Sequence, residues 1–124
     1  MTLEWLPMDF SVCKVGGITG GALAAPFTFF ARTDEEISLV CPSEYAPADA
    51  LKTEPGWRAF RVKGPLDFSL IGILADIAAC LARRQISIFA VSTFDTDYIL
   101  VKADRLPDAL EALEEAGYET VKQV

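Results

Sequence analysis

Residues 66–101 constrain the fold more than any other stretch, because a helical period in this segment is followed at once by two strand periods. Apolar residues in its first part recur at the i, i+4, i+7, i+8 and i+11 spacing of one helix face: Leu70, Leu74, Ile77, Ala78 and Leu81. The runs ISIFAVS and YILV are rich in β-branched and aromatic residues and predict two strands joined by the turn FDTD. The segment therefore predicts helix, strand, turn, strand, with the helix starting between Asp67 and Ser69.

The order of the predicted elements indicates two similar halves. Residues 57–124 predict strand, helix, strand, strand, helix, strand, which is the order of the ferredoxin-like fold. Residues 1–56 predict the same order with both helices shortened or missing, because a glycine-rich loop and a proline-rich loop stand in their places. The predicted fold class is α+β, with tandem ferredoxin-like (βαββαβ) units: a degenerate N-terminal unit at 1–56 and a C-terminal unit at 57–124.

Charge and hydropathy narrow the possible partners. The 124-residue chain carries 11 basic and 18 acidic side chains, a formal net charge of -7 at pH 7. Such a surface repels phosphate groups, so we expect no nucleic-acid binding and no association with anionic membranes. The apolar runs are shorter than the roughly 20 residues that span a bilayer, and the sequence shows no signal-peptide pattern at its start. We therefore expect a cytoplasmic protein.

The chain lacks part of the set of residue types that most often carry catalysis. The chain has no histidine, so neither a Cys-His nor a Ser-His pair can form, and a zinc site is not predicted. Cys13, Cys41 and Cys80 are widely spaced and are expected to be reduced core thiols. Two carboxylates as close in sequence as Asp95 and Asp97 are too common to predict a magnesium site. We expect no enzymatic activity, no cofactor and no metal.

Several segments resemble one family. DFSLIGILADIA, ISIFAVSTFDTDYILV, GWRAFRVKGPLDF and FARTDEEISLVCPSE are similar to ACT-domain proteins of the small, stand-alone amino-acid-sensing type, related to the cytosolic arginine sensors. The resemblance extends from Phe27 onward. It implies ACT units that pack side by side, an amino acid bound at the interface between them, and a regulatory role without chemistry.

The residues of the central stretch fit such a ligand. A helix N-terminus offers unpaired N–H groups and a positive dipole end to a carboxylate, and a glycine there allows close approach. The neighbouring turn offers acceptors for an ammonium group. The predicted ligand contacts are Ser69, Ile71, Gly72 and Ile73 at the helix start and Thr93, Asp95, Thr96 and Asp97 at the turn.

The predicted fold sets a condition on this site, and simpler roles stay open. We expect the helix start and the turn to lie at opposite ends of one unit, so the site would join two units of a homodimer or of one chain. Alternatively, the polar residues are ordinary helix caps and turn formers, and Gly72 serves only helix-to-sheet packing. A third reading is a dimerisation or protein-interaction module of the same fold without a working ligand site, with a contact surface formed by Trp5, Trp57, Phe29 and Phe30.

Overall fold

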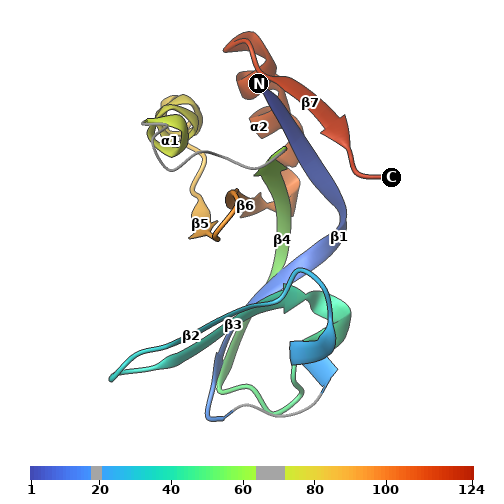
Figure 1. The fold of residues 1–124 in the computed structure, drawn as a ribbon, viewed down its shortest axis with the longest axis vertical. Helices are drawn as coiled ribbons and strands as arrows, with labels where there is room; N and C mark the ends of the chain where they lie inside the picture. The colour runs from blue at the N-terminus through green and yellow to red at the C-terminus, as the bar shows by residue number, and fades with distance from the viewer. Residues whose placement is uncertain (18–20, 64–71) are drawn as a thin grey trace. The chain divides into compact units, whose positions relative to one another are not determined.

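The computed structural model describes residues 1–17, 21–63 and 72–124 (Figure 1). In chain order its elements are β1 Thr2–Val15, η1 Gly21–Ala24, β2 Phe29–Arg32, β3 Ile37–Pro42, η2 Ser43–Tyr45, β4 Lys52–Val62, α1 Ile73–Arg83, β5 Phe89–Ser92, β6 Asp97–Lys102, η3 Ala103–Arg105, α2 Leu106–Glu115 and β7 Glu119–Lys122. Hydrogen bonds connect the strands in the order β2-β3-β1-β4-β6-β5, and β7 pairs with β1. None of the helices in the described ranges has the length and apolar character needed to cross a membrane.

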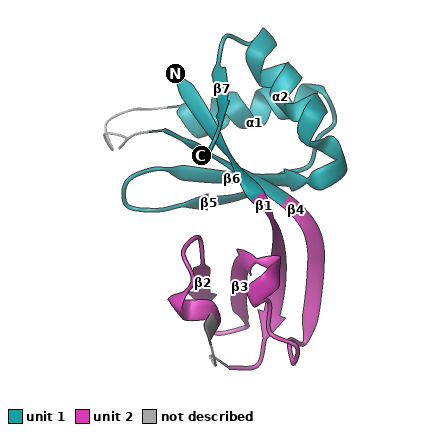
Figure 2. Cartoon of the chain, turned by 90° about the vertical axis from the view of Figure 1, so that its right-hand side faces the viewer, with its two compact units in different colours: residues 1–7, 58–124 teal, residues 8–57 magenta. Residues whose placement is uncertain are grey.

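The chain forms two compact units, shown in different colours in Figure 2. Unit 1 comprises residues 1–7 and 58–124, and unit 2 comprises residues 8–57. This division differs from the predicted units, 1–56 and 57–124, chiefly because residues 1–7 belong to unit 1. Thr2 to Trp5 pair in parallel with Glu119 to Lys122 of β7, and this pairing places the beginning of β1 in unit 1.

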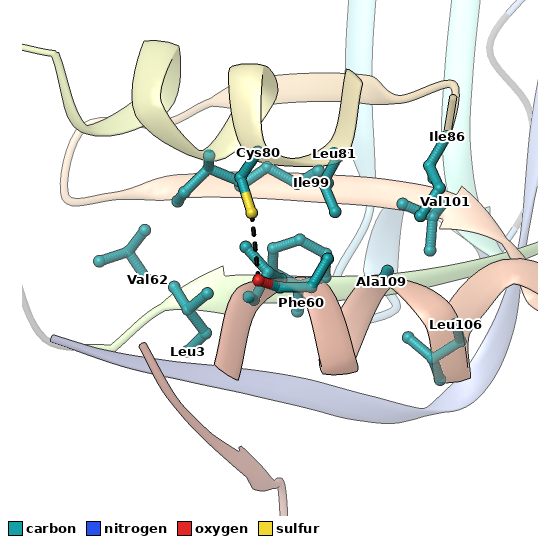
Figure 3. Close-up of a cluster of buried hydrophobic side chains, with 13 residues drawn as sticks. Leu3, Phe60, Val62, Cys80, Leu81, Ile86, Ile99, Val101, Leu106 and Ala109 are labelled. Atoms are coloured by element: carbon teal, nitrogen blue, oxygen red, sulfur yellow. Dashed lines mark hydrogen bonds between the residues drawn. The ribbon is translucent and has the colours of Figure 1, made fainter. Parts of the chain in front are cut away.

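Unit 1 has the predicted ferredoxin-like order: the end of β4, then α1, β5, β6, α2 and β7. Its core lies between the sheet and the two helices, and Figure 3 shows side chains from both layers pointing into it. Phe60 of β4 and Ile99 of β6 are fully buried there, as are Ile77 and Leu81 of α1. The helical spacing in the sequence thus predicts the buried face of α1 correctly where the structure describes it, and Leu70 lies outside the described residues.

Unit 2 repeats the strand order with turns in place of helices. In the order of elements, the short 3-10 helices η1 and η2 take the places that α1 and α2 take in unit 1, as predicted. β1 pairs antiparallel with β3, with Cys13 opposite Leu39. Cys13 and Cys41 are buried in the small core of this unit, and Cys80 is buried in unit 1. All three are unpaired thiols, as expected.

Several element boundaries differ from the predicted ones. β1 begins at Thr2 and β4 at Lys52, both in segments without a clear strand period. α1 begins at Ile73, and the predicted starting residues Asp67 and Ser69 lie outside the described part of the chain. Gly117, which follows α2, has a φ of 99°, the left-handed conformation that commonly ends a helix.

A tyrosine just before the last strand makes the stability of unit 1 fall as the pH rises in the alkaline range. The Tyr118 hydroxyl donates a hydrogen bond to the Asp76 carboxylate of α1. Burial, and then the bond to Asp76 and its charge, raise the pKa of Tyr118 to about 12. Since tyrosine in an unfolded chain ionises near pH 10, this contribution is fully present below about pH 10 and is lost as the pH rises towards 12.

We therefore expect Tyr118→Phe to unfold with a weaker dependence on pH between about 10 and 12 than the wild type, measured by urea denaturation at several pH values. Burial and the nearby Cys13 also raise the pKa of Cys41, to about 11, but Cys41 is present in both proteins and its effect cancels in the difference. A stability difference between the two proteins that stays constant across this range would contradict the prediction.

Candidate ligand-binding site

The N-terminus of α1 begins at a glycine. Gly72 is its N-cap residue, with a φ of 87°, and no side chain in the described ranges caps this end. The first intrahelical bond runs from the Asp76 N–H to the Gly72 carbonyl, at 2.8 Å. The N–H groups before Asp76 therefore lack intrahelical acceptors, and the positive end of the helix dipole lies with them.

Gly72 is needed at this point for its backbone conformation and not for space. A Cβ added to Gly72 would meet no described atom within 4 Å, so the close helix-to-sheet packing considered above is not its role. Its positive φ is a conformation that other residues rarely adopt. The glycine thus leads the chain into α1, with no capping side chain among the described residues.

The turn between β5 and β6 is held by its own hydroxyl groups. The Thr93 N–H and hydroxyl both donate to the Thr96 carbonyl, at 2.8 and 3.0 Å. The Thr96 hydroxyl donates to the Val62 carbonyl at the end of β4, at 2.6 Å. Ser92 donates to the Asp97 carboxylate at 2.6 Å. Both threonines therefore have structural roles, and the turn is fixed against the end of β4.

The helix start and this turn lie at the same end of unit 1, so the prediction of opposite ends is wrong. The Thr96 bond places the turn at the Val62 end of β4. The C-terminal end of α1 lies next to Ile86, because the Ile86 N–H donates to the Leu81 carbonyl. Figure 3 shows Ile86 and Val62 on opposite sides of the core, so α1 begins on the Val62 side. A single unit therefore brings both predicted halves of the site to one end.

The turn residues nevertheless divide between the two faces of the sheet. Ile99 and Val101 of β6 point into the core beneath the helices. Because side chains alternate along a strand, Asp97 is on that same face, at the end where α1 begins. Thr93, Asp95 and Thr96 instead line a groove on the other side. The structure thus groups Asp97 with the helix start and separates Asp95 from it.

The groove has a volume of about 630 Å³ and contains residues that the sequence did not single out: Glu4, Arg61, Lys63 and Tyr98, beside Val62 and the three turn residues. Arg61 donates through Nε to Glu4 Oε1 at 2.9 Å and through Nη1 to the Tyr98 hydroxyl at 3.0 Å. Burial lowers the pKa of Arg61, but the hydrogen bonds and charges of Tyr98 and Glu4 outweigh it, so the pKa is raised. The guanidinium is therefore charged and fixed in position.

The predicted contacts can now be placed. Ser69 and Ile71 lie outside the described residues, whereas Gly72 and Ile73 form the start of α1. Thr93, Asp95 and Thr96 lie in the turn between β5 and β6, and Asp97 is the first residue of β6. Ligand contact by these residues stays a prediction.

With this fold and this arrangement, the chain belongs to the ACT-domain family, whose model matches residues 52–115. The family resemblance found in the sequence is therefore confirmed.

Among curated proteins, the chain is similar to cytosolic arginine sensor for mTORC1 subunit 1. It is 37% identical to the protein from Bos taurus in an alignment of length 105 that covers 77% of this chain and 32% of that protein. It is 40% identical to the human protein in an alignment of length 96 that covers 70% of this chain and 29% of that protein. The chain thus spans about a third of the length of the curated relatives that it matches.

Solved structures show the same fold. Protein Atu0741 from Agobacterium tumefaciens is 31% identical, with a TM-score of 0.90 over 99% of this chain and 93% of that chain. The ligand-free regulatory subunit of aspartate kinase from Thermus thermophilus is 12% identical, with a TM-score of 0.59 over 89% of this chain and 93% of that chain. At 12% identity this second likeness concerns the fold alone.

Proposed function

We propose that this chain is a non-catalytic regulatory module that binds a free amino acid at the end of unit 1. One observation carries the proposal: the N-terminus of α1, which no side chain of the described ranges caps, and the Asp97 carboxylate lie at the same end and on the same face of the sheet. The first suits a carboxylate and the second suits an ammonium or guanidinium group. A free amino acid carries both kinds of group on one small molecule.

The contacts divide by chemistry. The backbone of Ile71, Gly72 and Ile73, with the hydroxyl of Ser69, holds the ligand carboxylate, and Asp97 holds its cationic group. The relatives named as arginine sensors support an amino acid as the ligand class and agree with a carboxylate that faces a cation. Thr93, Asp95 and Thr96 line the groove on the opposite face of the sheet, so we place them outside the contacts of this ligand.

The proposal includes self-association. Gly72 is exposed and Ile73 is partly exposed, so the site opens outward from unit 1. We propose that a second ACT unit covers it in a cytoplasmic homodimer, and that residues 8–57 are a degenerate ACT-like unit. The net charge of -7 supports small-molecule binding over nucleic-acid or membrane binding.

A thermal-shift screen of the purified chain against the proteinogenic amino acids, at millimolar concentration, tests the proposal. A ligand at a hundred times its dissociation constant adds about 2.7 kcal/mol to the free energy of unfolding. In a domain of this size that raises the melting temperature by several degrees. Acetate and methylammonium serve as controls, because each supplies only one half of the ligand.

A selective shift with one or a few amino acids is the expected result. Equal shifts with acetate and methylammonium would indicate a general salt effect. No shift with any amino acid, with a dimer still present in size-exclusion chromatography, would favour the interaction module without a ligand site.

A further inference from the structure

We propose that the groove lined by Glu4, Arg61, Lys63, Asp95 and Tyr98 is a second ligand site of unit 1, and that it binds a small zwitterion. This site is independent of the amino-acid site beside α1. Leu3, Phe60, Val62 and Ile99 point into the core beneath the helices. Their strand neighbours Glu4, Arg61 and Tyr98 therefore stand on the opposite face of the sheet.

The floor of the groove is pre-organised. Glu4 Oε1 accepts hydrogen bonds from Arg61 Nε at 2.9 Å and lies 2.8 Å from Nη2. The guanidinium also lies 5.9 Å from the centre of the Tyr98 ring and donates to its hydroxyl. The side chains of Arg61 and Glu4 are only 28% and 12% exposed. A guanidinium held in this way loses little further freedom when a ligand arrives, which favours binding.

The rim carries two opposite charges that do not meet. Within residues 1–17, 21–63 and 72–124, the side chains of Lys63 and Asp95 make no hydrogen bond or ion pair, although both line the groove. The backbone holds each of them in place. The Lys63 N–H donates to the Thr2 carbonyl at 3.0 Å, and Asp95 belongs to the turn closed by Thr93 and Thr96. The groove therefore presents a cation and an anion that form no ion pair with each other among the described residues.

A zwitterion matches this pattern. Its carboxylate would lie at Lys63, next to the Arg61 guanidinium, and its ammonium group at Asp95. Glu4 already compensates the charge of Arg61, so one further cation and one further anion remain to be neutralised. The volume of about 630 Å³ falls within the usual range of small-molecule sites. A ligand with a single charge would leave one rim residue without a partner.

The test is a titration of the full chain, labelled with ¹⁵N, in which NMR monitors the amide chemical shifts. The probes are glycine, β-alanine and γ-aminobutyrate, which differ in the span between carboxylate and ammonium, with acetate and methylammonium as half-ligands. We expect saturable shifts at Arg61, Lys63 and the turn 93–96 with at least one zwitterion. Lys63→Gln and Asp95→Asn should each weaken that binding at least about tenfold. Lys52→Gln, which alters an exposed lysine of unit 2, should leave it unchanged.

The position of the shifts separates this inference from the proposed function. Saturable shifts confined to Gly72–Asp76 and Asp97 would overturn the second site and support the amino-acid site beside α1. Shifts confined to the groove would support the second site and overturn the amino-acid site beside α1. Shifts at the groove that persist at full affinity in both Lys63→Gln and Asp95→Asn would overturn the proposed rim contacts and with them the second site.

Discussion

Asp97→Asn is expected to weaken amino-acid binding by about 10- to 150-fold, because it removes one charge-assisted hydrogen bond worth about 1.5–3 kcal/mol. The unliganded protein should melt at nearly the same temperature. Asparagine keeps an oxygen that accepts the hydrogen bond of the Ser92 hydroxyl, now 2.6 Å from Asp97 Oδ1. Calorimetric titration with the amino acid found in the thermal-shift screen gives the change in affinity.

The matched control is Asp34→Asn. Asp34 is an exposed aspartate between β2 and β3, so it tests the loss of one charge in a hairpin turn far along the chain from the site. It should leave the affinity unchanged. If Asp97→Asn binds as tightly as the wild type, Asp97 is not a ligand contact. If it lowers the melting temperature of the unliganded protein by several degrees, Asp97 is chiefly a structural residue.

Phe60→Ala should lower the free energy of unfolding by about 3–5 kcal/mol, the largest effect we expect from a single substitution. Phe60 is fully buried in the core of unit 1 and its aromatic ring lies among side chains from both helices and the sheet (Figure 3). Its loss leaves a cavity that the surrounding side chains fill only in part. Since domains of this kind are stable by about 5–15 kcal/mol, much of that stability would be lost.

Urea denaturation followed by circular dichroism measures this effect. Leu51→Ala is the control, because the Leu51 side chain is 65% exposed and its truncation should change stability by no more than about 0.5 kcal/mol. A cost for Phe60→Ala of less than about 1.5 kcal/mol would show that the core can close around the missing ring, which its complete burial argues against.

Local patterns predicted the elements that depend on local signals. The apolar spacing of α1 and the β-branched runs of β5 and β6 are readable within a few residues, and the structure confirms these elements. The beginning of β1 pairs with β7, which comes last in the sequence of unit 1, so the residues of β1 themselves carry little signal. β4 includes Pro55 and Gly56, which usually end strands, yet it continues through both.

The candidate site was predictable in part. The glycine at the helix start and the aspartates of the turn were visible in the sequence. Their division between two faces was not, because alternation applies within a strand and Asp95 lies in the turn. The partners Glu4 and Arg61 are 57 positions apart, so no local pattern joins them. The end at which the turn lies could have been derived from the element order, since a helix that runs back along β4 returns the next strand to the same end.

The division of β1 has a consequence for how the chain acquires its fold. Thr2 to Trp5 leave the ribosome before all of unit 2, but their partner β7 is synthesised after it. Unit 2 has both of its long strands available once residue 57 has emerged, whereas unit 1 must wait for residue 122. A strand edge of β1 therefore stays unpaired until β7 has emerged, and such edges are where unwanted pairing begins. We expect unit 2 to fold first and unit 1 to close around a segment that is already ordered.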